Sequence, residues 1–328
     1  MDSTTDTTTV QGEQKEGYIQ YPPVKTWVAQ IAPNSTDKNA SGFHDQLNQQ
    51  QFEGLQKFKQ EIDKEKLGID YNFYDDLYLL RFLRARKFDI PKTMIMFKKF
   101  LDWRAKEKVD EIRESFAFEE VLEVKKFYPH SYHKTDKNGR PIYIELLSQV
   151  NVDELFKVTT EQNMIKYYVR EYERLMTRRF PACSAMMKKP VEQSLTILDL
   201  QGIGIGILVG KIKSFVNLAS DIGQDYYPEM LGTMLLLNTN FFFNAVWAIV
   251  KVFIDEKTRK KITFCGSGYQ KYILEYADAA NVPSIIGGTC KCEHIEGGCL
   301  YSDIGPWNPT GGIKVGDKNT LKEAPTNA

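Results

Sequence analysis

The sequence has no excess of charge of either sign, because 43 lysine and arginine residues balance 43 aspartate and glutamate residues. Nucleic-acid-binding proteins usually carry a basic excess, so we expect no nucleic-acid partner and only local basic sites. The N-terminus, MDSTTDTTTVQGEQKEG, lacks the basic start and apolar core of a signal peptide, and neither end carries a lipidation motif. Five cysteines, an odd number, favour reduced thiols and a cytoplasmic protein.

Histidine is also scarce, and no catalytic motif is complete. Only four histidines occur, and none is an evident partner for a nucleophile. The glycines of Gly202–Gly206 follow an expected strand, but a dinucleotide fingerprint needs glycine where Ile207 stands. The loop Cys265–Lys271 ends in lysine, where a cysteine phosphatase needs arginine to bind phosphate through two parallel hydrogen bonds. We therefore expect a protein that is not an enzyme and has no cofactor.

Potential metal ligands gather near the C-terminal end, at Cys290, Cys292, His294 and Cys299. Thiolate and imidazole groups are the ligands that zinc prefers. However, the C-x-C spacing is tighter than in common zinc knuckles, and no second knuckle follows. The sequence therefore favours reduced packing thiols over a metal site.

The most apolar stretch runs from Met234 to Ile254 and is interrupted by Asn238-Thr-Asn240. The part from 241 to 254 has the length of a helix of about 21 Å. Such a helix is too short to cross a bilayer. An apolar helix of this kind is typical of a protein core, and the alternative is a lid over an apolar cavity. A basic run that ends at Lys261 follows directly.

Hydrophobic periodicity divides the chain into four regions. Residues 1–45 are polar and are expected to be a disordered tail, and residues 46–125 to be a small helical domain. In residues 126–305, strands expected at 140–146, 195–200, 234–237, 262–265 and 285–286 alternate with helices, one of them at 208–222. Such alternation predicts an α/β sheet with crossover connections. Residues 306–328 are expected to be a C-terminal tail.

Several co-linear motifs then carry a resemblance to a known family. They are LRFLRARKFD (80–89), YHKTDKNGRPIY (132–143), FPACS (180–184), TILDL (196–200), YYPE (226–229) and YSDIGPW (301–307). Together they resemble the CRAL-TRIO lipid-binding family, and the fungal phosphatidylinositol/phosphatidylcholine transfer proteins in particular. The resemblance covers about residues 46–308. It implies an apolar pocket in the α/β domain that holds one phospholipid and is gated by a mobile helix.

The resemblance also implies site residues. Those that would contact the phosphatidylinositol headgroup are Arg86, Lys87, Glu229, Thr258 and Lys261. Those that would contact phosphatidylcholine are Tyr132, Tyr143, Ser194 and Thr196. The gate helix would be residues 241–254, with apolar positions Phe241, Phe242, Phe243, Val246, Trp247, Ile249, Val250 and Phe253.

The chemistry of these residues agrees with the two lipids. Ser194 and Thr196 stand two apart on one strand, so both hydroxyls face the same side. Tyrosine rings attract a quaternary ammonium by cation–π interaction. The sequence departs from the family pattern in two places. Ser131 replaces a tyrosine near the phosphatidylcholine residues, and Lys251-Val252 replaces Lys-Pro near the end of the gate helix.

The expected partners are a phospholipid cargo, membrane surfaces at the Golgi and endosomes, and a phosphoinositide kinase, and the protein is expected to be a monomer. Two alternatives stay open at this point. One is a carrier of another apolar ligand, such as a sterol, squalene or a tocopherol-like molecule. The other is a regulator that presents lipid to a kinase without net transfer.

Overall fold

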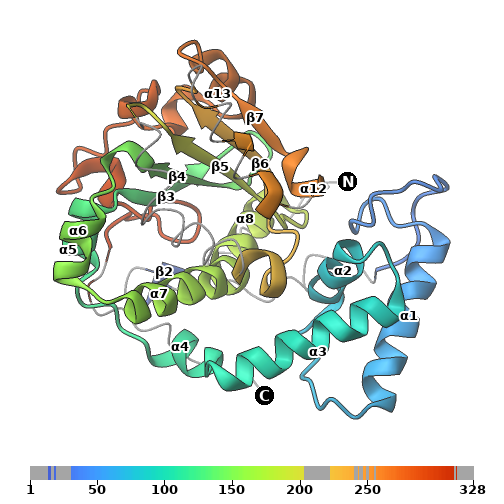
Figure 1. The fold of residues 1–328 in the computed structure, drawn as a ribbon. Coiled ribbons are helices and arrows are strands. Elements are labelled where there is room, and N and C mark those ends of the chain that lie inside the picture. The colour runs from blue at the N-terminus through green and yellow to red at the C-terminus, as the bar shows by residue number, and fades with distance from the viewer. Residues whose placement is uncertain are drawn as a thin grey trace, which may run out of the picture.

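The computed structural model describes residues 31–202, 222–239 and 256–313, with the short stretches 14–15, 18–19, 243, 247–248, 251–254 and 315. A group of helices, α1 (Gln49–Lys64), α2 (Asp76–Ala85) and α3 (Ile90–Lys106), lies beside a larger body built on a sheet (Figure 1). The chain passes between them through α4 (Val109–Ser115) and α5 (Val121–Phe127).

The helical group forms because each helix has a capped start and one apolar face. Asn48 and Gln51 make a capping box at the start of α1, and Asp75 accepts a hydrogen bond of 2.9 Å from the backbone of Tyr78 in α2. The apolar faces meet in one fully buried core, which includes Leu55, Phe58, Ile62, Leu79, Phe82, Phe97 and Phe100. This agrees with the helical domain expected from the sequence.

The larger body contains a five-stranded sheet in the order β3-β4-β5-β6-β7. The strands are β3 (His130–Thr135), β4 (Pro141–Leu146), β5 (Ser194–Asp199), β6 (Leu231–Leu237) and β7 (Ile262–Phe264). β3 and β4 are antiparallel, and the other neighbours are parallel. The predicted α/β sheet with crossover connections is therefore confirmed.

Further helices lie around this sheet. They include α6 (Val152–Val158), α7 (Glu161–Arg174), α8 (Phe180–Met187), α12 (Glu256–Arg259) and α13 (Gln270–Tyr276). Short 3-10 helices are η2 (Leu147–Gln149), η4 (Lys251–Phe253), η5 (Ala279–Asn281), η6 (Ser284–Ile286) and η7 (Gly298–Tyr301), and Leu175–Arg179 forms one π-helical segment after α7. Two strands of two residues each, β1 (Gln14–Lys15) and β2 (Tyr18–Ile19), pair in an antiparallel manner.

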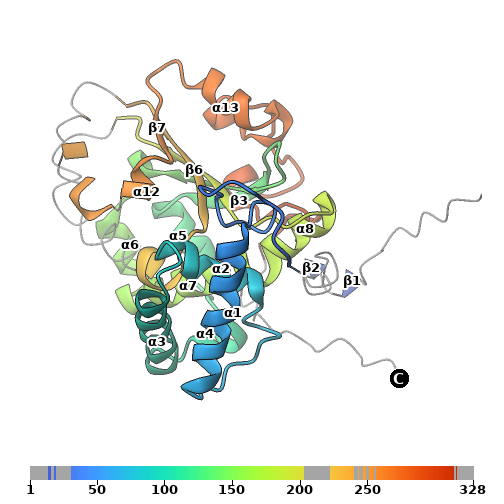
Figure 2. The same cartoon turned by 90° about the vertical axis from the view of Figure 1, so that its right-hand side faces the viewer.

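The two faces of the sheet have different roles. One face packs Ile144, Ile197 and Leu235 against Ile273 of α13 and against Val282 in a fully buried cluster. The opposite face of the sheet is turned towards α7 and α8. These helices lie below the sheet in Figure 1, and both Figure 1 and Figure 2 place them on the side of the sheet away from α13. Because side chains alternate along a strand, the residues between these apolar positions point to the α7 side.

Buried ion pairs join the helical group to the larger body. Arg84 Nη2 of α2 lies 2.8 Å from a carboxylate oxygen of Glu192, and Arg104 Nη1 of α3 lies 2.7 Å from Glu173 of α7. All four side chains are almost fully buried. Arg81 adds hydrogen bonds to the backbone oxygens of Glu192 (2.7 Å) and Glu229 (3.2 Å).

The structure differs from the sequence-based expectations in three places. Residues 31–45, assigned above to a disordered tail, lie against α1 and α2: the backbone N–H of Asn34 donates to the Leu47 oxygen at 2.8 Å, and Arg84 stacks on Phe43. Ile285–Ile286 belongs to η6 rather than to a strand. Trp307, assigned to the C-terminal tail, is buried, and its indole N–H donates to the Asp303 backbone at 2.9 Å. The helix expected at 208–222 lies almost entirely outside the described residues.

Among the described helices, none combines the length and the apolar character that crossing a membrane would need.

Candidate functional site

A cavity of about 1040 Å³ lies on the α7 side of the sheet. This is at the upper end of the range for small-molecule pockets, which is about 300–1,000 Å³. Alternate residues of four neighbouring strands line it: His130 and Tyr132, Tyr143 and Glu145, Ser194, Thr196 and Leu198, Met234 and Leu236. The period of two along β5 places Ser194 and Thr196 on this face, as the sequence predicts.

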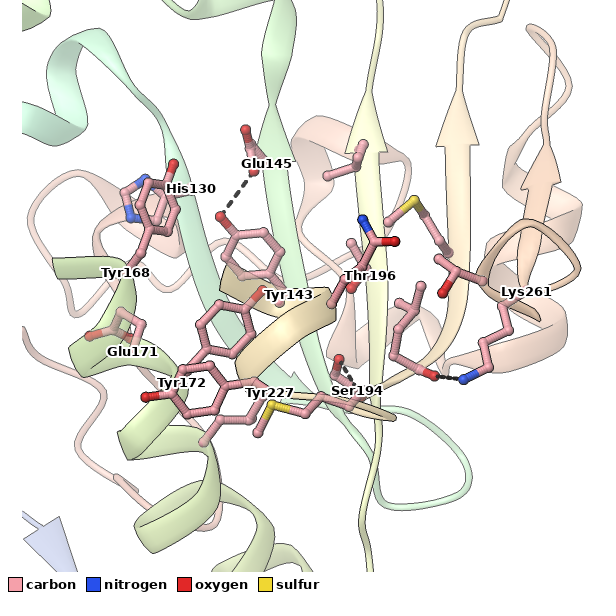
Figure 3. Close-up of a pocket in the computed structure, with 18 of the residues that line it drawn as sticks. His130, Tyr143, Glu145, Tyr168, Glu171, Tyr172, Ser194, Thr196, Tyr227 and Lys261 are labelled. Carbon is pink, nitrogen blue, oxygen red and sulfur yellow. Dashed lines mark hydrogen bonds between the residues drawn. The ribbon is translucent and has the colours of Figure 1, made fainter. Parts of the chain in front are cut away.

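Basic residues from two distant parts of the chain meet at one end of the cavity. Arg86 and Lys87 follow the end of α2, while Lys257 and Lys261 lie in or just after α12, and all four line the cavity. Figure 3 shows Lys261 on one side of the site and His130 with Tyr168 on the other, with Ser194 and Thr196 of β5 between them.

Glu229 is the carboxylate at this basic end, and it is held firmly. Lys257 Nζ lies 2.7 Å from one of its oxygens, and Lys261 Nζ lies 3.4 Å from the other. Burial raises the pKa of this carboxyl group, but the charges of Lys261 and Lys257 outweigh burial and leave the pKa below its ordinary value. Its backbone has a φ of 62°, an uncommon conformation for a non-glycine residue, and its carbonyl accepts the hydrogen bond from Arg81.

The opposite end of the cavity is lined with tyrosines around one buried carboxyl group. Tyr143 donates to Glu145 at 3.0 Å, and Tyr168 donates to Tyr128 at 2.9 Å. Burial raises the pKa of Glu145 to about 7, although hydrogen bonds from Tyr143 and Tyr128 lower it in part. At neutral pH this carboxyl group is therefore partly protonated, and a nearby cation would favour its ionised form.

Tyr132 is already stacked against a cation of the protein. The Arg179 guanidinium lies 3.9 Å from the centre of the Tyr132 ring and is held by Glu171 at 2.7 Å and Asp303 at 3.0 Å. Burial raises the pKa of Glu171, but Arg179 and its neighbours outweigh burial and bring the pKa well below the ordinary range. One face of Tyr132 is therefore occupied. The neighbouring Tyr143 ring, 5.1 Å away between centroids, makes no cation–π contact within the part of the chain that the structure describes.

The described part of the predicted gate segment lies against β7. The rings of Phe243 and Trp247 lie 5.4 and 5.0 Å from the ring of Phe264, and both residues line the cavity. Phe241, Phe242, Val246, Ile249 and Val250 lie outside the described residues, and only the backbone of Phe253 is described, in η4. Val252 is 70% exposed.

All nine predicted headgroup residues line this one cavity: Arg86, Lys87, Glu229, Thr258 and Lys261 at the basic end, and Tyr132, Tyr143, Ser194 and Thr196 along the sheet. Sequence reasoning missed Glu145, Tyr168 and Lys257. Glu145 stands two residues after Tyr143 on β4, so the strand period could have placed both on one face. Tyr168 is brought to the site by α7, and the sequence contains no signal for that contact.

The chain matches the CRAL/TRIO domain over residues 122–288 and the N-terminal CRAL/TRIO domain over residues 50–99. The chain therefore belongs to the CRAL/TRIO family, which confirms the resemblance in the sequence. The crystal structure of Sfh5 has a TM-score of 0.53 at 20% identity, covers 68% of this chain and 82% of its own, and supports the fold.

Named relatives are more similar in sequence. The SEC14 cytosolic factor of Kluyveromyces lactis is 43% identical over 85% of this chain and 90% of its own length. That of Eremothecium gossypii is 48% identical over 72% and 76%. The phosphatidylinositol/phosphatidylcholine transfer protein SFH7 of Arabidopsis thaliana is 44% identical over 74% of this chain, but over only 44% of its own length.

Proposed function

We propose that this protein binds one molecule of phosphatidylinositol or phosphatidylcholine and carries it between membranes. The observation that carries the proposal is a single large cavity with a basic end, a tyrosine-lined end and apolar residues along the sheet and the gate segment. The plant relatives that are named phosphatidylinositol/phosphatidylcholine transfer proteins support the same two lipids.

The cargo would need to be enclosed because acyl chains are costly to expose. Burial is worth about 0.8 kcal/mol per CH₂ group, so two chains of ordinary length contribute roughly 25 kcal/mol. Phe243 and Trp247 line the cavity from the gate segment and would cover the chains. When the gate segment opens at a bilayer, its apolar side chains would contact lipid instead of water.

An inositol phosphate would occupy the basic end. Arg86, Lys87 and Lys261 offer charge-assisted hydrogen bonds to a phosphate, which are stronger than bonds between neutral groups. Glu229 accepts hydrogen bonds, so inositol hydroxyls can take the place of part of its contact with the two lysines.

A choline headgroup would lie at the tyrosine-lined end. Tyr143 supplies a ring face for the quaternary ammonium, and Glu145 supplies a carboxyl group whose ionised form the ammonium would stabilise. Ser194 and Thr196 lie between the two ends and would donate to the phosphodiester. The two headgroups would therefore use different residues of one cavity.

The double variant Arg86→Ala, Lys261→Ala tests the inositol end. Losing one hydrogen bond to a charged group costs about 1.5–3 kcal/mol. Two such losses predict a fall of at least about a hundredfold in phosphatidylinositol transfer between vesicles, with phosphatidylcholine transfer unchanged. Lys106→Ala, an exposed lysine at the end of α3, is the control. Equal loss of both activities in a folded protein would contradict separate headgroup sites.

The double variant Ser194→Ala, Thr196→Ala tests the phosphodiester contacts, and the opposite selectivity is expected. Phosphatidylcholine transfer should fall about tenfold or more, and phosphatidylinositol transfer should be retained. Unchanged phosphatidylcholine transfer would remove this part of the proposal.

Further features belong to the same proposal. The protein would act without catalysis, as a monomer, by brief contact with cytoplasmic membrane surfaces at the Golgi and endosomes, and a phosphoinositide kinase would use the lipid it delivers. The two alternatives predict other results in the same vesicle assays. A carrier of a sterol, squalene or a tocopherol-like molecule would transfer that ligand instead of the two phospholipids. A protein that presents lipid to a kinase would show no net transfer.

A further inference from the structure

Four potential metal ligands come together outside the lipid cavity. His133 of β3, Cys290, Cys292 and Cys299 each place one ligand atom within 4.8 Å of the others. His133 is fully buried, as are Cys292 and Cys299 almost entirely. The predicted histidine of this region, His294, is exposed and is not a member of the group. His133 takes its place, from a strand more than a hundred residues earlier in the sequence.

The histidine is arranged as a neutral ligand. The Ser302 hydroxyl donates to the Cys299 carbonyl at 2.7 Å, so its oxygen accepts at 3.1 Å from His133 Nδ1–H. The proton on Nδ1 leaves the lone pair on Nε2, and Nε2 is a buried nitrogen with no hydrogen-bond partner. Metal-binding histidines commonly have their second nitrogen fixed by such a hydrogen bond.

The sulfur atoms have the spacing of a metal site. Cys290 Sγ and Cys292 Sγ lie 3.7 Å apart. With zinc–sulfur bonds of about 2.3 Å, two sulfurs of a tetrahedral site lie about 3.8 Å apart. A disulfide would need about 2.05 Å, and all five cysteines of the chain are free thiols.

We propose that His133, Cys290, Cys292 and Cys299 bind one zinc ion in a closed structural site. Four protein ligands complete a tetrahedral coordination shell, so no coordination position is left for a reacting substrate, and three of the four ligands are buried. The ion would fasten the segment 290–302 to the edge strand β3. The next residue, Asp303, pairs with Arg179 at the lipid cavity, so the zinc site would support one wall of that cavity.

The test is the metal content of the full-length protein, purified without chelators or metal-affinity resin and measured by inductively coupled plasma mass spectrometry. About one zinc per chain is expected, falling at least about tenfold in His133→Ala and in Cys292→Ser. Matched controls are His294→Ala and Cys183→Ser, which change the same residue types outside the group and should keep the zinc.

A second measurement covers variants that fail to fold. Chelation of the wild-type protein should lower its melting temperature, and added zinc should restore it. Replacing zinc by cobalt under reducing conditions should give the visible bands of tetrahedral cobalt–thiolate coordination. The proposal is overturned if the wild-type protein neither holds zinc nor gives these bands with cobalt, or if zinc content is the same in His133→Ala and His294→Ala. A disulfide among the three cysteines in freshly purified protein would also overturn it.

Discussion

Glu145 is a buried carboxyl group on β4 that lines the cavity. It is 9% exposed, it accepts a hydrogen bond from Tyr143, and burial raises its pKa to about 7. In the unfolded chain the same group titrates near 4.5. Between these two pH values the folded protein holds one more proton than the unfolded chain. The free energy of unfolding therefore falls as pH rises through this window, by up to about 1.4 kcal/mol per unit.

Glu145→Gln should remove this pH dependence from the lipid-free protein. The variant is expected to gain roughly 3 kcal/mol of stability relative to wild type between pH 4.5 and pH 7, and little beyond. Urea unfolding at a series of pH values measures the difference. Glu123→Gln, on an exposed glutamate paired with Lys126, is the control. A constant difference between Glu145→Gln and wild type across this range would show that Glu145 is not buried in the way described.

At the scale of single residues, sequence reasoning succeeded where one local rule decides the outcome. The strand period placed Ser194 and Thr196 on one face, and both line the cavity. It failed where two elements meet. His133 was missed as a candidate ligand because its cysteine partners lie far along the chain.

At the scale of elements, the segment Lys251–Ile254 has one residue in the lining of the cavity and another on the protein surface. Ile254 lines the cavity, whereas Val252 is 70% exposed. An exposed branched apolar side chain next to the cavity is suited to contact with a bilayer during opening. The neighbouring Lys251 is exposed and can approach anionic headgroups.

Val252→Glu should therefore slow lipid transfer several-fold without loss of stability. Exposed positions away from special contacts usually change stability by less than about 0.5 kcal/mol. A carboxylate at this place opposes contact with anionic vesicles, so both transfer and vesicle binding should fall. Ile95→Glu is the matched control, because Ile95 of α3 is 68% exposed and far from the gate segment in the sequence. Equal slowing by both variants would contradict a specific role for this segment.

The elements themselves were largely predictable. Apolar periodicity located the helical domain at 46–125, which contains α2 and α3, and the alternation of strands and helices gave the parallel part of the sheet. Ile285–Ile286 was misassigned because two branched residues fit a short strand as well as a 3-10 turn, and the turn closes through Gly287 at a φ of 88°. For such short segments the tertiary contacts decide whether the backbone forms a strand or a turn.

At the scale of the whole molecule, the helical group is fixed to the α/β body by buried charges. The Glu192 carboxylate lies 2.8 Å from Arg84 Nη2, and the Glu192 backbone oxygen accepts a hydrogen bond of 2.7 Å from Arg81. Arg81 also binds the carbonyl of Glu229 at the basic end of the cavity. The helical group therefore helps to position the site to which it contributes Arg86 and Lys87.

Glu192→Ala should destabilise the whole protein by about 3–5 kcal/mol, because its carboxylate lies 2.8 Å from the buried guanidinium of Arg84 and 4.0 Å from that of Arg81. The variant leaves both cations without this counter-charge. Unfolding in urea should remain a single transition with a lower midpoint. Glu114→Ala removes an exposed partner of Arg113 and should change stability by less than about 1 kcal/mol. A Glu192→Ala protein as stable as Glu114→Ala would show that this interface does not hold the molecule together.

The most direct test of the account is native mass spectrometry of the purified protein, followed by extraction and identification of whatever is bound. We predict one phospholipid per chain, phosphatidylinositol or phosphatidylcholine, with phosphatidylinositol depleted in Arg86→Ala, Lys261→Ala. A sterol, squalene or tocopherol-like molecule in the cavity, or no lipid bound even after incubation with vesicles of the two phospholipids, would contradict it.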